Sequence, residues 1–74
     1  MTATFWLPAR ADGDRWTASS GQEFVGRDVV YGKLGKVGKV ERVTPVNAGR
    51  ALRLHVRLSR KLVSPDRRKF ELVK

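Results

Sequence analysis

The chain has 74 residues, carries a formal net charge of +9 and contains no cysteine. A domain of this size buries only about 60% of its unfolded surface, so it offers little room for an enclosed substrate cleft. Disulfides and thiolate metal sites are excluded, and no apolar stretch approaches the roughly 18 residues of a membrane span. The N-terminus also lacks the basic and then apolar order of a signal peptide, so we expect one soluble, cytoplasmic domain over residues 1–74 with no membrane contact.

Charge is distributed unevenly along the chain. Residues 1–25 have a net charge of −1, whereas residues 26–74 contain fourteen lysines and arginines and have a net charge of +10. A field of this sign attracts polyanions, so we expect nucleic acid as the partner, with an acidic protein or a larger assembly as the alternative. A basic surface that serves only solubility is the plainer interpretation.

The N-terminal part, residues 1–25, is expected to form a β-hairpin. Thr2–Leu7 is rich in β-branched and aromatic residues, which favour a strand. The Ala-Asp-Gly-Asp cluster at 11–14 favours a turn that would return the chain through residues 15–18. A further strand is predicted over residues 27–31, at the start of the basic part of the chain.

The clearest pattern lies in residues 52–58, where apolar and basic-type residues alternate. The apolar set is Leu52, Leu54, Val56 and Leu58, and the intervening set is Arg53, His55 and Arg57. A period of two places the first set on one face of a strand and the second on the other. We therefore expect a half-buried strand with a cationic outer face.

Weaker signals flank this strand. Residues 39–43 alternate loosely, Pro45 ends that strand or places it on a sheet edge, and Asn-Ala-Gly at 47–49 makes a turn. Residues 59–63 could form a single helical turn, and residues 69–73 are predicted to form the closing strand. Several short strands joined by such turns indicate an all-β fold, a small antiparallel barrel of five or six strands with at most one short helical turn.

Catalytic chemistry has little support in this sequence. The single histidine, His55, stands in mid-strand without cysteine or another partner, which is more typical of a surface residue than of a base. Asp12 and Asp14 flank a glycine, where aspartate is ordinary turn chemistry, although an acid and base pair or a metal loop is the functional alternative. We expect a non-enzymatic protein with no cofactor.

The segment 32–43 repeats a Gly-Lys step every three residues. Glycines fall at 32, 35 and 38, and the lysines are Lys33, Lys36 and Lys39. No Gly-Lys step is followed by serine or threonine, so the segment is not a Walker loop. It could grip a sugar-phosphate backbone, because glycine permits close approach and lysine attracts phosphate. Equally, the glycines could serve only a bulge and a tight barrel corner.

The residues Gly35, Lys36, Gly38, Lys39, Val40 and Val43 resemble the KOW motif, GKxGKVxxV, of ribosomal proteins and transcription elongation factors. The same stretch is similar to a PRC-barrel, in which Gly26 and Val29 precede a strand like residues 37–43. The loop between Val30 and Gly35 is shorter than the KOW family usually has. Both resemblances cover residues 26–43 and imply an SH3-like barrel; KOW proteins contact RNA or DNA, and PRC-barrels include ribosome-maturation factors and protein-docking modules.

Together these features predict an extended cationic stripe that tracks a phosphate backbone. Its expected nucleic-acid-binding residues are Lys33, Lys36, Lys39, Arg42, Arg53, Arg57, Arg60, Lys61, Arg67 and Arg68. The early aromatic residues Phe5, Trp6, Trp16 and Phe24 are expected to make core or dimer contacts rather than to stack on bases. The predicted function is backbone-dominated, weakly sequence-specific binding, with RNA slightly ahead of DNA; a protein-docking or structural assembly module is the alternative.

Overall fold

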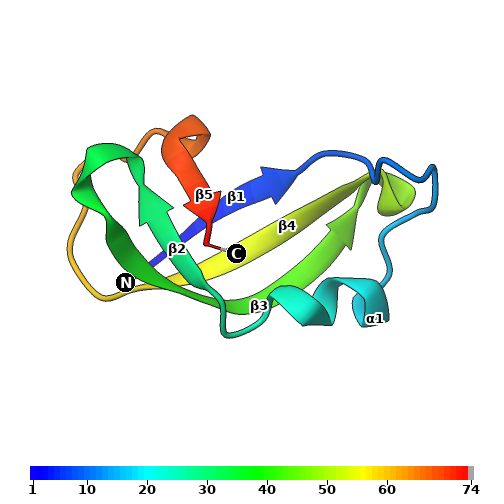
Figure 1. Cartoon of the computed structure of the whole chain (residues 1–74), viewed down its shortest axis with the longest axis horizontal. Helices are drawn as coiled ribbons and strands as arrows, with labels where there is room; N and C mark the ends of the chain where they lie inside the picture. The colour runs from blue at the N-terminus through cyan, green and yellow to red at the C-terminus, as the bar shows by residue number, and fades with distance from the viewer. Residues whose placement is uncertain (74) are drawn as a thin grey trace.

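The computed structural model describes residues 1–73 and shows one antiparallel sheet of five strands (Figure 1). The strands are β1 (Thr2–Leu7), β2 (Asp28–Tyr31), β3 (Lys36–Val46), β4 (Ala51–Leu58) and β5 (Phe70–Leu72). Their order in the sheet is β1-β4-β3-β2-β5. The predicted all-β class with five short antiparallel strands is therefore confirmed.

The sheet curls into a half-barrel whose two edge strands approach each other. The rings of Phe5 on β1 and Phe70 on β5 stack with their centroids 5.6 Å apart. Phe70 also meets Tyr31 edge to face at 4.9 Å, and the Tyr31 hydroxyl accepts a 2.8 Å hydrogen bond from the backbone N–H of Asp66. Aromatic packing thus brings together two strands that stand at opposite ends of the sheet order.

The core occupies the concave face of the sheet. Leu52, Leu54 and Val56 are fully buried, and Leu58 is 9% exposed, which confirms the predicted inward face of β4. The other buried side chains come from all parts of the half-barrel and include Phe5, Phe24, Val29, Val37, Val40 and Phe70. Each strand therefore contributes to one small hydrophobic cluster.

Two irregularities bend β3, which is longer than the predicted strand at 39–43. The pairing of β3 with β4 shifts between Val40 and Arg42, and its pairing with β2 shifts between Val29 and Val30. At the second shift, a Cβ atom on Gly38 would lie 2.2 Å from the carbonyl oxygen of Arg57. Glycine is required there because the backbones of β3 and β4 approach so closely.

The predicted N-terminal hairpin of residues 1–25 is wrong. β1 pairs antiparallel with β4, with Phe5 opposite Leu54, rather than with residues 15–18. The chain instead enters a short helix, α1 (Ala18–Gly21), followed by a 3₁₀ turn at Gln22–Phe24. This helical segment packs against β3 at the end of the half-barrel (Figure 1).

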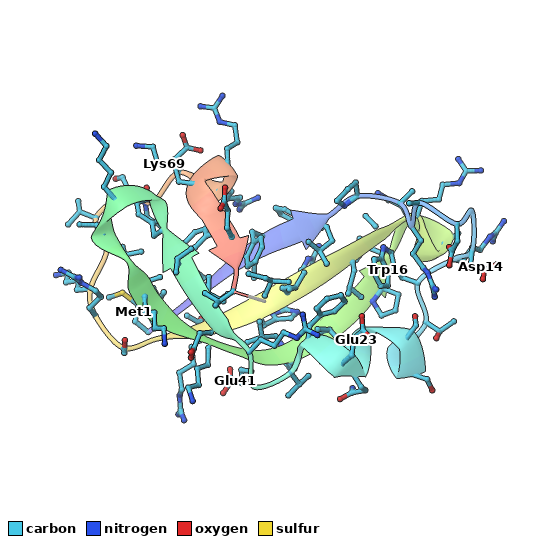
Figure 2. All side chains as sticks on the ribbon, in the orientation of Figure 1. Met1, Asp14, Trp16, Glu23, Glu41 and Lys69 are labelled. Atoms are coloured by element: carbon cyan, nitrogen blue, oxygen red, sulfur yellow. The ribbon has the colours of Figure 1, made fainter. Side chains whose placement is uncertain are left out.

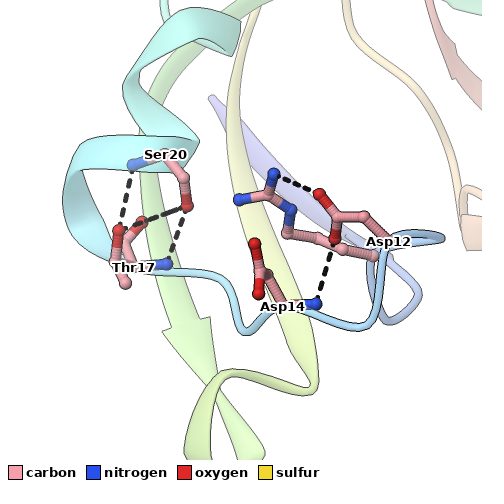
Figure 3. Close-up of polar contacts among 5 residues, drawn as sticks. Asp12, Asp14, Thr17 and Ser20 are labelled. Carbon is pink, nitrogen blue, oxygen red and sulfur yellow. Dashed lines mark hydrogen bonds and ion pairs between the residues drawn. The ribbon is translucent and has the colours of Figure 1, made fainter.

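A capping box begins α1. The Thr17 hydroxyl accepts a hydrogen bond from the Ser20 backbone N–H, and the Ser20 hydroxyl accepts one from the Thr17 N–H (Figure 3). The predicted helical turn at 59–63 is absent, since these residues form only bends and coil. The one α-helical turn within residues 1–73 lies instead at Ala18–Gly21, in the N-terminal part that we expected to form a hairpin.

The turns of the basic part largely follow the sequence pattern. β3 continues through Pro45 to Val46. Pro45 pairs with β4 on one side and lies beyond the residues that pair with β2 on the other. It therefore stands on a local sheet edge, which is one of the two alternatives predicted. A turn at Asn47–Gly49 joins β3 to β4. Further 3₁₀ turns, η2 at Gly32–Leu34 and η4 at Arg67–Lys69, precede β3 and β5. No helix in residues 1–73 is long and apolar enough to cross a membrane.

Candidate nucleic-acid interface

The convex face of β3 and β4 carries a row of cationic side chains. Cross-strand pairs point to the same face of a sheet, and the pairs that alternate with the buried leucines and valines point away from the core. The outward pairs of β3 with β4 are Lys39 with Arg57, Arg42 with His55, and Thr44 with Arg53. The register thus brings four of the predicted site residues onto one surface, which we call the convex cationic face.

The β2–β3 end of this face is partly neutralised by a carboxylate. Asp28 lies 3.0 Å from the Lys36 ammonium and 3.9 Å from that of Lys39. The hydrogen bond from Lys36, together with the two ammonium charges, holds the pKa of Asp28 below its usual range. Because both lysine side chains remain about 70% exposed, they are still accessible to a second anion.

An open hollow of about 410 Å³ lies at the same end. Asp28, Lys36, Gly38, Lys39, Arg57, Leu58 and Ser59 line it. The Ser59 hydroxyl donates to the carbonyl oxygen of Val37 at 3.1 Å, which ties the chain after β4 to β3. Three predicted cations therefore surround one concave spot on the surface.

Arg57 lies opposite Lys39 at this end of the face, and Arg42 lies nearer the middle, opposite His55. The Arg57 side chain is 78% exposed, and its Nε lies 4.0 Å from a carboxylate oxygen of Glu41. Glu41 stands in the β3 bulge next to Arg42 and lies at the lower margin of Figure 2. An exposed pair at this distance contributes little to stability, so Arg57 can exchange Glu41 for another anion.

His55 lies between these arginines and is half-buried. Its Nε2 lies 3.2 Å from the Thr44 hydroxyl. Burial lowers the pKa of His55, and the positive charges of Arg42 and Arg53 lower it further against a smaller opposing effect of Glu41. Both effects favour the neutral form of the imidazole. The prediction that Arg53, His55 and Arg57 all lie in solvent holds fully for Arg57 only, since the other two are half-buried.

Arg53 is half-buried because it packs against Trp6. The Arg53 guanidinium carbon is 5.4 Å from the Trp6 ring centroid, and that of Arg67 is 4.6 Å from it. The Trp6 side chain lies opposite Arg53 on β1 and remains 37% exposed. Of the two contacts expected for Trp6, the core contact is wrong, because the side chain stands at the border of the convex cationic face. The dimer contact stays a prediction.

The signal that could have placed Trp6 was the alternation within β1. Thr2, Thr4 and Trp6 pair with the outward residues of β4, whereas Phe5 pairs with the buried Leu54. Phe5 and Phe24 lie in the core, and Trp16 packs edge to face on Phe24 at 5.7 Å, as predicted for those three aromatic residues. Trp16 also donates from its indole N–H to the carbonyl oxygen of Pro8 at 2.9 Å.

The remaining predicted cations lie in turns. Lys33 is exposed in η2, and Arg60 and Lys61 are exposed after β4. Arg68 in η4 is paired with Asp66 at 3.1 Å, and its hydrogen bonds hold the pKa of Asp66 below the usual range. Figure 2 shows nitrogen-tipped side chains projecting into solvent around η4, where Lys69 is labelled, and around the end of the sheet where Met1 lies.

The other candidate features serve local structure. Asp12 accepts hydrogen bonds from the Asp14 backbone N–H and from Arg10, which is turn chemistry (Figure 3). No group of three or more metal-ligating side chains occurs within residues 1–73. The larger hollow, about 550 Å³ beside Trp16, is lined by residues between Leu7 and Glu23 and by none of the predicted site residues.

Comparison with known proteins adds no assignment. No protein-family model, no curated protein and no solved structure matches this chain.

Proposed function

We propose that this chain is a non-enzymatic module that binds nucleic acid mainly through the sugar-phosphate backbone. The observation that carries the proposal is the register of β3 and β4, which aligns Lys39, Arg42, Arg53 and Arg57 on one uncovered face. Alternate residues on a strand are about 6.6 Å apart and neighbouring strands about 4.8 Å apart, so these cations form a compact surface grid. Such a grid attracts successive phosphates without reading base identity.

The helical segment is a poor candidate for sequence-specific recognition. Residues 18–24 contain Glu23 and no lysine or arginine, and they pack against β3 rather than standing clear of the sheet. Major-groove recognition by a helix needs a basic, projecting helix with side chains that reach base edges. Weakly sequence-specific binding through the sheet is therefore the better fit to this fold.

We favour RNA slightly over DNA as the nucleic acid that this chain binds. The reason is the resemblance of residues 35–43 to the KOW motif and of residues 26–43 to a PRC-barrel, families with ribosome-associated members. The half-barrel fold is compatible with both families, but the fold does not distinguish one family from the other. We accordingly propose the family relationship as a hypothesis alongside the function.

Fluorescence-anisotropy titrations on duplex DNA and on structured RNA test the proposal at several salt concentrations. We expect saturable binding whose affinity falls steeply with salt, because phosphate binding releases condensed counterions. No saturable binding to either polymer at low salt would overturn the proposal. Salt-insensitive capture of an acidic protein would instead favour the docking alternative, in which exposed Trp6 acts as an anchor.

A further inference from the structure

We infer that Trp6 is a base-stacking platform, so the module prefers single-stranded over duplex nucleic acid. The inference rests on the proposed function and names its substrate class. Trp6 is the one aromatic side chain among the exposed large apolar residues of the described chain, and it borders the convex cationic face. A duplex keeps its bases stacked inside, whereas an unpaired base can turn toward an exposed indole.

Trp6 is placed to contact a base of a single-stranded nucleic acid that lies along β4. Arg57 and Arg53 are four residues apart on β4, about 13 Å, and Trp6 lies directly opposite Arg53 on β1. A phosphate backbone held along this line would present a neighbouring base at the β1 edge. The threonines Thr2 and Thr4 complete the β1 side of the face with short hydroxyl side chains that leave room for it.

The two arginines at Trp6 differ in how firmly they are held. Arg53 lies within β4 and is half-buried, and its Nε is enclosed without a hydrogen-bond partner. Arg67 is exposed in the η4 turn. Within residues 1–73, no carboxylate lies within 4 Å of the Arg67 guanidinium, because neighbouring Asp66 is paired with Arg68. The Arg67 guanidinium thus has the Trp6 ring as its main contact.

A base can therefore displace Arg67 from the indole. An exposed cation–π contact shifts an equilibrium by a factor of about 2 to 5. Stacking of a base on an aromatic side chain contributes a factor of about 5 to 150. Arg67, once displaced, is positioned to meet the phosphate of the same nucleotide, so its charge is retained in the complex. Arg53 stays in place and supports the indole.

Affinity measurements on the full chain and on Trp6→Leu test the inference. Leucine keeps an apolar contact for the Arg67 stem but has no aromatic face. The probes are a single-stranded oligonucleotide of about ten nucleotides, within the range that small barrels cover, a blunt duplex, and an abasic strand of the same length. Val63→Ala is the matched control, because Val63 is an exposed apolar residue in the connection after β4.

We expect Trp6→Leu to lower single-strand affinity by about 5- to 150-fold, with little change on the duplex or the abasic strand and with an unchanged salt dependence. Val63→Ala should bind all three probes like the parent protein. Equal losses on all probes, or no loss on the single strand, would overturn the inference. If Trp6→Leu fails to fold, Trp6→Phe replaces it, with a smaller loss expected and parental single-strand binding as the contrary result. A parent protein that binds none of the probes would refute the proposed function instead.

Discussion

The double substitution Lys36→Ala, Lys39→Ala tests whether these two lysines bind phosphate or only neutralise Asp28. Each phosphate neutralised on duplex DNA contributes about −0.9 to the slope of log affinity against log salt, so two lysines contribute at most about 1.8. Asp28 lies 3.0 and 3.9 Å from the two ammonium groups and competes with phosphate for them. If Lys36 stays paired with Asp28 when nucleic acid binds, only Lys39 neutralises a phosphate. The double substitution then flattens the slope by about 0.9 rather than by about 1.8.

The variant Asp28→Asn shows whether Lys36 stays paired with Asp28 in the complex or binds phosphate. Removing the carboxylate frees Lys36, so we expect a steeper salt dependence and tighter binding than in the parent protein. Anisotropy titrations at four or more salt concentrations measure each slope, and thermal unfolding checks that every variant is folded. Both lysines are exposed, so the fold should survive.

The matched control removes two exposed arginines from the far end of the sheet, Arg15→Ala, Arg50→Ala. β4 separates Arg50 from the β2–β3 end by about 25 Å, well beyond the Debye length of about 8 Å at physiological salt. The control should leave the slope nearly unchanged. An equal change in both double variants would show that total charge, rather than the convex cationic face, sets the affinity, and our reasoning would be refuted.

Three further predictions concern the fold that supports this face. Leu54→Ala should lower the free energy of unfolding by about 2–5 kcal/mol in urea titrations, since Leu54 is fully buried; a loss well below this range would contradict the burial. Gly38→Ala should cost about 1–3 kcal/mol or more, because its Cβ would meet the Arg57 carbonyl oxygen; an unchanged midpoint would contradict the close approach of β3 and β4. The lowered pKa of His55 means that its neutral form favours folding above the unfolded value of about 6.5, and that this stability is lost as pH falls below 6.5 toward the folded pKa. His55→Gln should remove that part of the pH dependence between pH 7.5 and 5, and an identical profile would disprove the assignment.

The strand β4 could be predicted from sequence because its alternation is strict. A register slip of one residue would bury Arg53, His55 and Arg57 and expose the aliphatic residues, so the hydrophobic pattern alone determines which side faces the core. The turn at Asn47–Gly49 was also predicted, because turn chemistry is a local property. Five strands could therefore be recognised before their pairing was known.

The pairing of β1 could not be predicted in the same way. The turn cluster at 11–14 favours a hairpin by local rules, yet β1 pairs with β4 about fifty residues further along the chain. α1 was missed because serine and glycine disfavour a helix interior. The reciprocal Thr17 and Ser20 cap stabilises its start, and Gly21 fits against Val43 where a Cβ would lie 2.8 Å from a methyl group. These are tertiary effects that local propensity does not contain.

The glycines of the Gly-Lys repeat illustrate how one motif can serve two purposes. Gly35 has φ of 76°, and Gly38 permits the close approach of β3 and β4, so both are required by the fold whether or not nucleic acid binds. The lysines of the same repeat point into solvent and make no core contact. The structural interpretation therefore accounts for the glycines, and the function of the segment has to be tested on its lysines.

The distribution of carboxylates points to the Trp6 end as the stronger part of the convex cationic face. Lys36, Lys39 and Arg57 each lie within about 4 Å of Asp28 or Glu41, so a phosphate that binds them must displace an existing partner. Arg53 and Arg67 have no carboxylate within 4 Å among the residues that the structure describes, and both guanidinium groups lie over the Trp6 ring. An incoming phosphate therefore gains more at Arg53 and Arg67 than at the paired lysines. Binding should begin where charge is least compensated, and the only exposed aromatic ring on the described part of the face lies at that same place.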